Sequence, residues 1–157
     1  MSEHQYLTAP VASKEMPKGI PYIIGNEAAE RFSFYGMKGI LTIFMTKYLF
    51  LLGDTAGTPI DPSEAIARYH EFTSLVYLTP VMGAFLADTI LGKYRTILSL
   101  SIVYCLGHFA LAFMGSPGMS AESWMLTGLY LIALGSGGIK PCVSAHVGDQ
   151  FGKTNGH

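Results

Sequence analysis

Four ionisable side chains lie close together in the segment NEAAERFSFYGMKG, residues 26–39: Glu27, Glu30, Arg31 and Lys38. At helical spacing Glu27, Arg31 and Tyr35 occupy positions i, i+4 and i+8, so they share one face of a helix. Glu30 lies one position round from Arg31. Carboxylates beside a guanidinium can bind and release protons or exchange one anionic partner for another. The spacing therefore predicts proton transfer or anion binding.

The sequence around this cluster is apolar, with YII at 22–24 before it and ILTIF at 40–44 after it. In a helix that begins at Pro21, Arg31 lies about 15 Å along the axis, in the middle of a hydrocarbon layer roughly 30 Å thick. A central Arg, Asp or Lys costs about 2.5–3.5 kcal/mol to insert, whereas a Leu, Ile or Phe contributes about 0.3–0.6 kcal/mol. A solvated face on a soluble helix is the alternative. The apolar flanks favour an ionisable cluster inside a membrane.

The composition is typical of a membrane protein. Of the 157 residues, 50% are hydrophobic and 13% are charged, against a charged share of about 25% in soluble domains. The net charge of −1 and the lack of a basic stripe argue against nucleic-acid binding. Cys105 and Cys142 have no metal-ligand spacing, so we expect no disulfide, metal site or cofactor. We find no nucleophile–base pair and do not expect an enzyme.

Turn signals divide the chain into four predicted transmembrane helices, at residues 21–52, 62–88, 95–115 and 121–150. Together they predict an all-α polytopic membrane protein with one four-helix bundle over residues 21–150. Residues 1–20 and 151–157 are polar tails, and the first has no apolar run that would make a signal peptide. The run Asp61-Pro62-Ser63-Glu64 predicts an N-cap, a first-position proline and a capping box.

Basic residues near the helix ends predict the orientation. They occur in the first tail, the second connection and the last tail: Lys14, Lys18, Lys93, Arg95 and Lys153. The first and third connections have none. By the positive-inside rule, both termini face the cytoplasm.

A second intramembrane cation, Lys140, lies in the run GSGGIKP of the fourth helix. It precedes Gln150 by about 15 Å of helix, which predicts the same depth as Arg31. Tyr77 falls near the same level, and His70 lies nearer the outer face. Two cations, two carboxylates and tyrosines at one depth predict a midplane site for an anionic or zwitterionic solute, or a proton relay.

These motifs resemble one known family. NEAAERFSFYGMKGIL resembles the E-x-x-E-R-F-x-Y-Y-G signature of the proton-dependent oligopeptide transporters (the POT family), a branch of the major facilitator superfamily. Further matches follow in the family's order: ARYHEF…YLTP, the G-x-x-x-x-D…L-G-K connection at 83–93 and GSGGIKPCVSAHVGDQF. Phe34 replaces the first tyrosine of the signature, and Ala84 replaces a common glycine. The resemblance implies that these helices are the N-terminal part of a facilitator fold of about twelve helices in two bundles.

The resemblance implies proton-coupled symport of di- and tripeptides. Arg31 and Lys140 would hold the peptide carboxylate, and Tyr35 and Tyr77 would line the site. Two glutamates and a histidine would couple transport to protons: Glu27, Glu30 and His70. A Glu27–Arg31 pair would be broken by protonation of Glu27 or by a peptide carboxylate on Arg31, so each event would favour the other.

The connection between the second and third helices resembles the superfamily's cytoplasmic gating loop, with Asp88, Gly92, Lys93 and Arg95 as the matching residues. A capped turn that obeys the positive-inside rule explains these residues nearly as well. For His70, hydrogen-bonded packing is the alternative to proton handling. The expected partners are a small peptide, protons, the lipid bilayer, and either further helices or a second copy of the chain, in the plasma membrane.

Two other functions stay open on the sequence alone. A carrier of nitrate or another anion would use the paired cations equally well, although the retained acids Glu27 and Glu30 favour proton coupling. A small four-helix membrane protein that works as a homo-oligomer or a partner subunit fits the length. We expect the chain to be an N-terminal fragment of a transporter that needs further helices to work.

Overall fold

The computed structural model is built of helices over the residues that it describes, which are 9, 10, 12, 14–53 and 58–152. Its four long helices are α1 (Ile20–Lys47), α2 (Pro62–Leu86), α3 (Lys93–Ala112) and α4 (Ala121–Gly148). A 3-10 turn, η1 (Leu49–Leu51), follows α1, and a π-helical turn, η2 (Ala87–Leu91), follows α2. The predicted all-α fold is confirmed. Lys153 with the rest of 153–157, and half of the first predicted tail, lie outside the described residues.

Three predicted helix ends were placed too late. The first helix ends at Lys47 instead of residue 52, because the backbone tightens into η1. The third ends at Ala112 instead of residue 115, in a turn whose Phe113 carbonyl accepts hydrogen bonds from the next residues. The fourth ends at Gly148 instead of residue 150. Helix ends fray, so sequence patterns locate them less well than helix centres.

The predicted connection between the second and third helices is mostly helical. Asp88, expected at the end of a helix ending at residue 88, lies within η2, and α3 begins at Lys93 instead of residue 95. Gly92 alone interrupts the helical backbone between η2 and α3. Its φ is 76°, a conformation that glycine adopts without strain. Its carbonyl accepts the first hydrogen bond of α3, from Thr96 N at 3.1 Å. The second and third helices are therefore joined by a π-helical turn and a single residue that is not helical.

The start of α2 confirms the predicted N-cap. Asp61 Oδ1 accepts hydrogen bonds from the backbone N–H of Ser63 at 2.8 Å and from its hydroxyl at 2.5 Å. These bonds lower the pKa of the Asp61 carboxyl below its ordinary value. The Glu64 carboxylate, which was expected to complete a capping box, instead accepts a hydrogen bond from Arg68 at 2.6 Å.

Three helical segments are long and apolar enough to cross a membrane: Pro62–Leu91, Lys93–Ala112 and Ala121–Gly148. The shortest has 20 residues, which span about 30 Å. Helix α1 has 28 residues and is long enough, but the charged cluster that includes Glu27, Glu30 and Arg31 keeps it out of this set. A membrane position for α1 therefore requires a protein environment for these charges.

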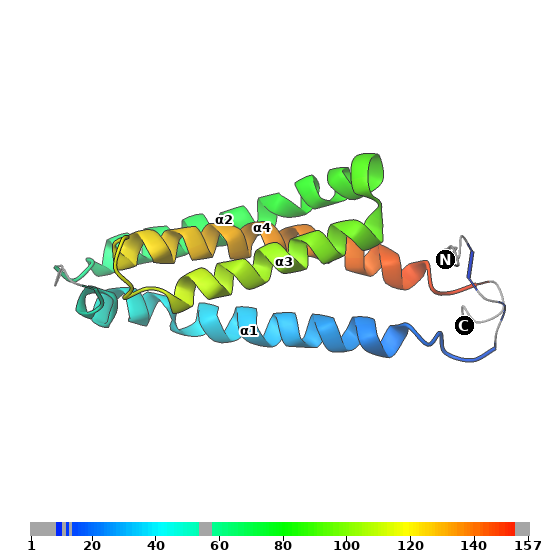
Figure 1. Cartoon of the computed structure of the whole chain (residues 1–157), viewed down its shortest axis with the longest axis horizontal. Helices are drawn as coiled ribbons and strands as arrows, with labels where there is room; N and C mark the ends of the chain where they lie inside the picture. The colour runs from blue at the N-terminus through cyan, green and yellow to red at the C-terminus, as the bar shows by residue number, and fades with distance from the viewer. Residues whose placement is uncertain (1–8, 11, 13, 54–57, 153–157) are drawn as a thin grey trace.

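Helix α4 lies between α2 and α3 and packs closely on both, while α1 runs along the bundle with fewer close approaches (Figure 1). A Cβ atom on Gly83 of α2 would overlap the backbone of Gly138 in α4. A Cβ atom on Gly107 of α3 would lie 2.9 Å from the carbonyl oxygen of Gly128 in α4. Small residues allow helices to approach closely where lipid supplies no hydrophobic driving force. Glycines on α2, α3 and α4 therefore allow the backbones of these helices to approach closely.

The two halves of α1 have different surroundings. The second half contributes Phe34, Leu41 and Met45 to the buried core, together with residues of α2 and α4. The earlier half carries Glu27, Glu30 and Arg31. The start of α1, the α2–α3 junction and the end of α4 lie at the same end of the bundle (Figure 1), as the predicted topology requires.

Candidate functional site

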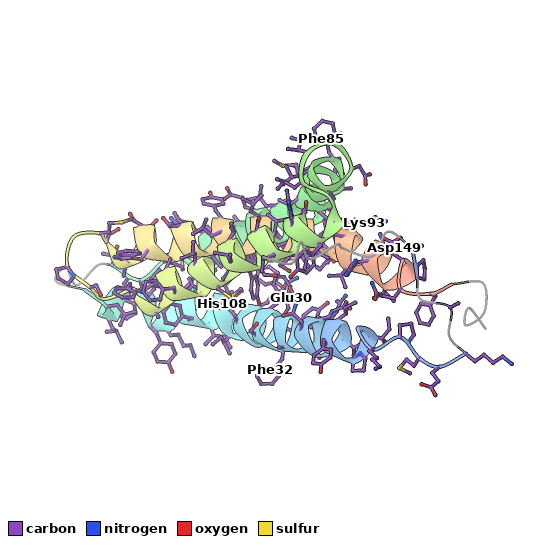
Figure 2. The ribbon with its side chains drawn as sticks, turned by 45° about the vertical axis from the view of Figure 1, so that its right-hand side comes forward. Glu30, Phe32, Phe85, Lys93, His108 and Asp149 are labelled. Carbon is purple, nitrogen blue, oxygen red and sulfur yellow. The ribbon has the colours of Figure 1, made fainter. Side chains whose placement is uncertain are left out.

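A cavity of about 230 Å³ lies between the first half of α1, the middle of α3 and the later part of α4. Glu30 lies between α1 and α3 in the side-chain view (Figure 2). The cavity wall carries two carboxylates and one ammonium group among its side chains. It comprises Asn26, Glu27, Ala29, Glu30, Ser33, Ser101, Tyr104, Cys105, Ile139, Lys140 and Val143. The structure thus brings the predicted acids Glu27 and Glu30 to the same cavity as Lys140, although more than 100 residues separate them in the sequence.

The predicted Glu27–Arg31 ion pair is present. Arg31 donates to Glu27 Oε1 from Nε at 2.9 Å and from Nη2 at 2.6 Å. The side chains are 43% and 37% exposed for Arg31 and Glu27, respectively. A pair that is this accessible contributes only about 0–1 kcal/mol in water. It can therefore be opened by a competing proton or anion.

Glu30 is held from two other helices. Its carboxylate accepts a short hydrogen bond from the hydroxyl of Ser136 in α4. Its backbone carbonyl accepts from the Tyr104 hydroxyl of α3 at 3.0 Å, and that hydroxyl also contacts Ser33 Oγ at 2.6 Å. Ser136 is fully buried and Tyr104 is 7% exposed. Sequence reasoning missed Ser33, Tyr104 and Ser136, because a single hydroxyl on an apolar helix does not reveal its partner.

Lys140 is the cation among the residues that line the cavity, and its environment differs from that of Arg31. Its ammonium lies 5.2 Å from the centroid of the Phe34 ring. In the described part of the chain it forms no ion pair. Its charge therefore remains available to an anionic ligand.

Four of the predicted proton-coupling and peptide-binding residues are not among those that line this cavity: Arg31, Tyr35, Tyr77 and His70. Tyr35 and Tyr77 are 55% and 75% exposed. His70 is also exposed and stacks edge-on against Tyr69, with 5.7 Å between ring centroids. Helical spacing correctly placed Tyr35 near Arg31, but it could not indicate which part of that face meets α3 and α4.

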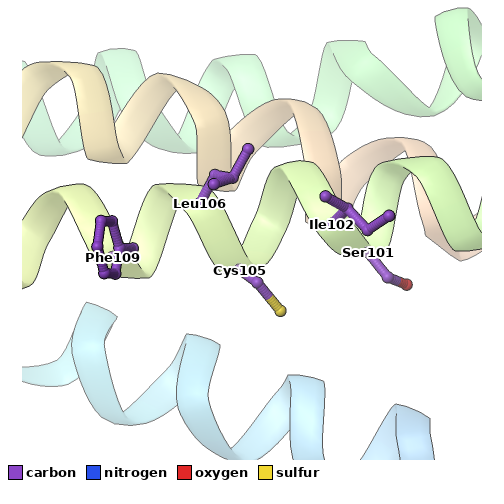
Figure 3. Close-up of a pocket in the computed structure, with 5 residues that line it drawn as sticks. All are labelled: Ser101, Ile102, Cys105, Leu106 and Phe109. Carbon is purple, nitrogen blue, oxygen red and sulfur yellow. The ribbon is translucent and has the colours of Figure 1, made fainter.

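A second hollow, of about 380 Å³, lies on the surface of α3 (Figure 3). It is lined by Ser101, Ile102, Cys105, Leu106 and Phe109. Ser101 and Cys105 point towards α1 and also line the polar cavity (Figure 3). No carboxylate or cation lines the hollow, so the polar cavity is the better candidate for a charged solute.

Comparison with known proteins agrees with the motifs. Residues 94–156 match the model of the POT family (PTR2). The chain is 47% identical over 137 residues to "Peptide transporter family 1" of Drosophila melanogaster, a match covering 86% of this chain and 17% of that protein. It is 44% identical over 143 residues to "Solute carrier family 15 member 2" of Danio rerio, covering 88% of this chain and 19% of that protein.

A third relative is "Solute carrier family 15 member 1" of Homo sapiens, 43% identical over 148 residues, a match covering 86% of this chain and 20% of that protein. The chain is related to the POT-family peptide transporters. This confirms the resemblance predicted from the motifs. The chain spans about a fifth of the length of these curated relatives.

The residues matching the gating loop of the superfamily lie at one end of the POT-related bundle. Lys93 Nζ donates to Asp149 Oδ2 at 2.7 Å, which joins the start of α3 to the end of α4 (Figure 2). Asp88 and Arg95 are exposed. Gly92 makes the sharp junction between η2 and α3. The structure thus brings Lys93 to a partner, Asp149, that the sequence did not indicate.

A second polar network lies near the opposite end, where α2 and α4 begin. Arg68 of α2 pairs with Glu64 at 2.6 Å and with Glu122 of α4 at 2.5 Å. The Tyr130 hydroxyl donates to Glu71 Oε1 at 2.9 Å. The i, i+4 spacing of Glu64 and Arg68 is readable from the sequence. The contacts between the two helices are not.

Proposed function

We propose that this chain is part of a proton-coupled symporter of di- and tripeptides. The observation that carries the proposal is the cavity that Lys140 lines together with Glu27 and Glu30, where Lys140 forms no ion pair with any carboxylate that the structure describes. Arg31, paired to Glu27, supplies a second cation that a ligand can capture. The relatives include a protein named as a peptide transporter. A free peptide offers the carboxylate that this pair of cations would bind.

The Glu27–Arg31 pair is the proposed coupling switch. A proton on Glu27 removes the charge that holds Arg31, and a peptide carboxylate on Arg31 removes the cation that holds Glu27. Each event therefore favours the other by a coupling free energy that is the same in both directions. Since an exposed pair contributes about 0–1 kcal/mol, either event can displace the equilibrium. The neighbouring Glu30, held by Ser136, is the second proposed proton-coupling acid.

The size of the cavity limits what it can bind. Its volume of about 230 Å³ is below the roughly 300–1,000 Å³ of most small-molecule pockets. We infer that it receives the carboxylate end of a peptide and that the rest of the peptide extends beyond it. Tyr35 and Tyr77, both exposed, stay predicted peptide contacts outside the cavity wall. His70 stays a predicted proton-handling residue.

We propose that the chain lies in the plasma membrane with both termini in the cytoplasm. Lys93 and Arg95 lie at the end of the bundle where α1 begins and α4 ends (Figure 1). The positive-inside rule assigns that end to the cytoplasm. Asp88, Gly92, Lys93 and Arg95 would then form a cytoplasmic gating element, in which the Lys93–Asp149 pair opens and closes.

The coupling proposal is tested with Glu27→Gln in the full-length gene product, reconstituted in liposomes. We expect loss of the acceleration of peptide uptake by an inward proton gradient, with peptide exchange at equilibrium retained. Glu64→Gln is the matched control, because Glu64 forms the same i, i+4 pair with Arg68 outside the cavity. Unchanged proton-driven uptake in Glu27→Gln would contradict the role of Glu27.

The carboxylate site is tested with Arg31→Ala and Lys140→Ala. We expect weaker uptake of dipeptides with a free carboxylate and a smaller change for the same dipeptides with an amidated C-terminus. Competition between the two substrates in proteoliposomes measures the difference. Equal losses for both substrates would mean that these cations do not bind the carboxylate.

A further inference from the structure

Phe34 follows the charged cluster in α1, and its buried ring is near two ammonium groups. Lys140 Nζ lies 5.2 Å from the ring centroid and Lys38 Nζ lies 6.0 Å from it. We propose that Phe34 is a positioning residue, which holds the Lys140 ammonium at the cavity through a cation–π contact and so sets the preference for peptides with a free carboxylate. The inference rests on the proposed function and adds a residue to its site.

An aromatic ring and a carboxylate attract a cation in different ways. The negative face of the aromatic quadrupole attracts an ammonium within about 6 Å but carries no net charge. Arg31 is already neutralised by Glu27. Lys140, among the residues that the structure describes, has a ring and no ion pair. Arg31 must therefore leave Glu27 before it can bind an anion, whereas Lys140 has no described carboxylate to leave.

The Phe34 ring is fixed by its own packing. It is 4% exposed and contacts the ring of Phe72 in α2 at 5.9 Å between centroids. It also meets Tyr35 edge-on at 5.4 Å. A lysine ammonium is a point charge on a flexible four-carbon stem, so a rigid surface beneath it restricts where the charge lies. That restriction determines where a bound carboxylate would lie.

Lys38 depends less on the same ring. Its ammonium lies 5.2 Å from the Tyr69 ring, closer than its 6.0 Å to Phe34. Lys140 has no second ring within this range among the described residues. Loss of the Phe34 ring should therefore affect Lys140 more than Lys38.

The test compares Phe34→Leu with Phe34→Tyr in the full-length transporter. Leucine keeps an apolar side chain but removes the π face, whereas tyrosine keeps it. For a dipeptide with a free carboxylate we expect Phe34→Leu to raise KM about fivefold with kcat little changed. We expect KM for the amidated dipeptide to stay unchanged. Phe34→Tyr should restore the wild-type KM.

Phe72→Leu is the matched control for damage to the core. Phe72 is 2% exposed and contacts the Phe34 ring, but no lysine ammonium lies over it in the described part of the chain. It should lower the amount of folded protein without discriminating between free and amidated peptides. Equal changes in KM for both peptides in Phe34→Leu would overturn the inference.

A direct measurement separates this inference from the proposed function. Reductive methylation of the purified transporter with isotope-labelled methyl groups gives each lysine an NMR signal, and Lys140→Arg assigns the signal of Lys140. We expect a ring-current shift of that signal in the wild type and in Phe34→Tyr, and its loss in Phe34→Leu. An unchanged shift in Phe34→Leu would overturn the inference. If the shift is lost as expected but Lys140→Ala retains its preference for free carboxylates, the carboxylate site fails while the Phe34–Lys140 contact stands.

Discussion

The bundle holds its helices together in two ways. Helices α2 and α3 pack on α4 through glycines, and a Cβ atom at Gly83 or Gly107 would meet backbone of α4. The first half of α1 instead meets its neighbours through hydroxyls, at Ser136 and Tyr104. Added Cβ atoms at Gly25 and Gly36 of α1 would meet nothing within 4 Å.

This difference distinguishes a scaffold, formed by α2, α3 and α4, from the charged first half of α1. Backbones in direct contact cannot separate without losing many van der Waals contacts at once, so we infer that α2, α3 and α4 behave as one unit. Hydrogen bonds between side chains can be made and broken singly, each at a small net free energy. The charged half of α1 is therefore the part best suited to respond to a proton or a peptide.

The largest expected effect is at the scaffold. Gly83→Ala places a methyl group on the backbone of Gly138, and α2 must move away from α4 to accommodate it. We expect destabilisation of about 1–3 kcal/mol, measured as a lower Tm of the purified protein in detergent. The matched control is Gly36→Ala in α1, which should be neutral or stabilising by up to about 1 kcal/mol. Equal losses in both variants would show that the close contact of Gly83 with α4 has no special part in stability.

The next effect concerns the attachment of α1. Tyr104→Phe removes the hydroxyl that contacts Ser33 and the Glu30 carbonyl. We expect a loss of about 0.5–1.5 kcal/mol, with faster hydrogen exchange in the first half of α1 and unchanged exchange in α4. Tyr22→Phe, at a side chain that is 82% exposed, is the control. Faster exchange throughout the bundle would show that α1 is not a separate unit.

A smaller effect is expected at the end of the scaffold. The Lys93–Asp149 pair is 35% and 52% exposed, respectively, and such pairs contribute about 0–1 kcal/mol. Lys93→Gln should therefore lower Tm only slightly, and less at high salt because the charges are screened. The charge-reversed double variant Lys93→Asp with Asp149→Lys should restore part of the loss. A fall in Tm as large as that of Gly83→Ala would mean that glycine packing does not dominate.

The smallest effect is the pH dependence of the α2 N-cap. The pKa of Asp61 is lowered by hydrogen bonds from Ser63. A lowered pKa in the folded state stabilises the protein above the unfolded value of about 3.9, and this contribution is lost as the pH falls through the folded pKa. Wild-type Tm should therefore fall more between about pH 5 and about pH 3 than that of Asp61→Asn, which keeps an acceptor but does not titrate there. Identical pH profiles of the two proteins would mean that the titration of Asp61 does not affect stability.

Much of the fold was accessible to sequence reasoning because its signals are local. Apolar runs predicted four helices, and the spacing of Glu27 and Arg31 predicted their ion pair. The boundary errors arose where the signal is weakest, as at Asp88, where the helical backbone continues through η2. Asp61 was readable as an N-cap because the cap and its donors lie within three residues.

The helices, the charged face of α1 and the likeness to peptide transporters could be read from the sequence, since each depends on residue types at short and regular spacing. Which groups meet depends on how the helices pack. This packing brought Lys140 onto the ring of Phe34 and Ser136 onto Glu30, and it left Tyr77 and His70 outside the cavity. The reason is geometric: a helix presents residues in every direction, and the packing of its neighbours determines which of them become buried and paired.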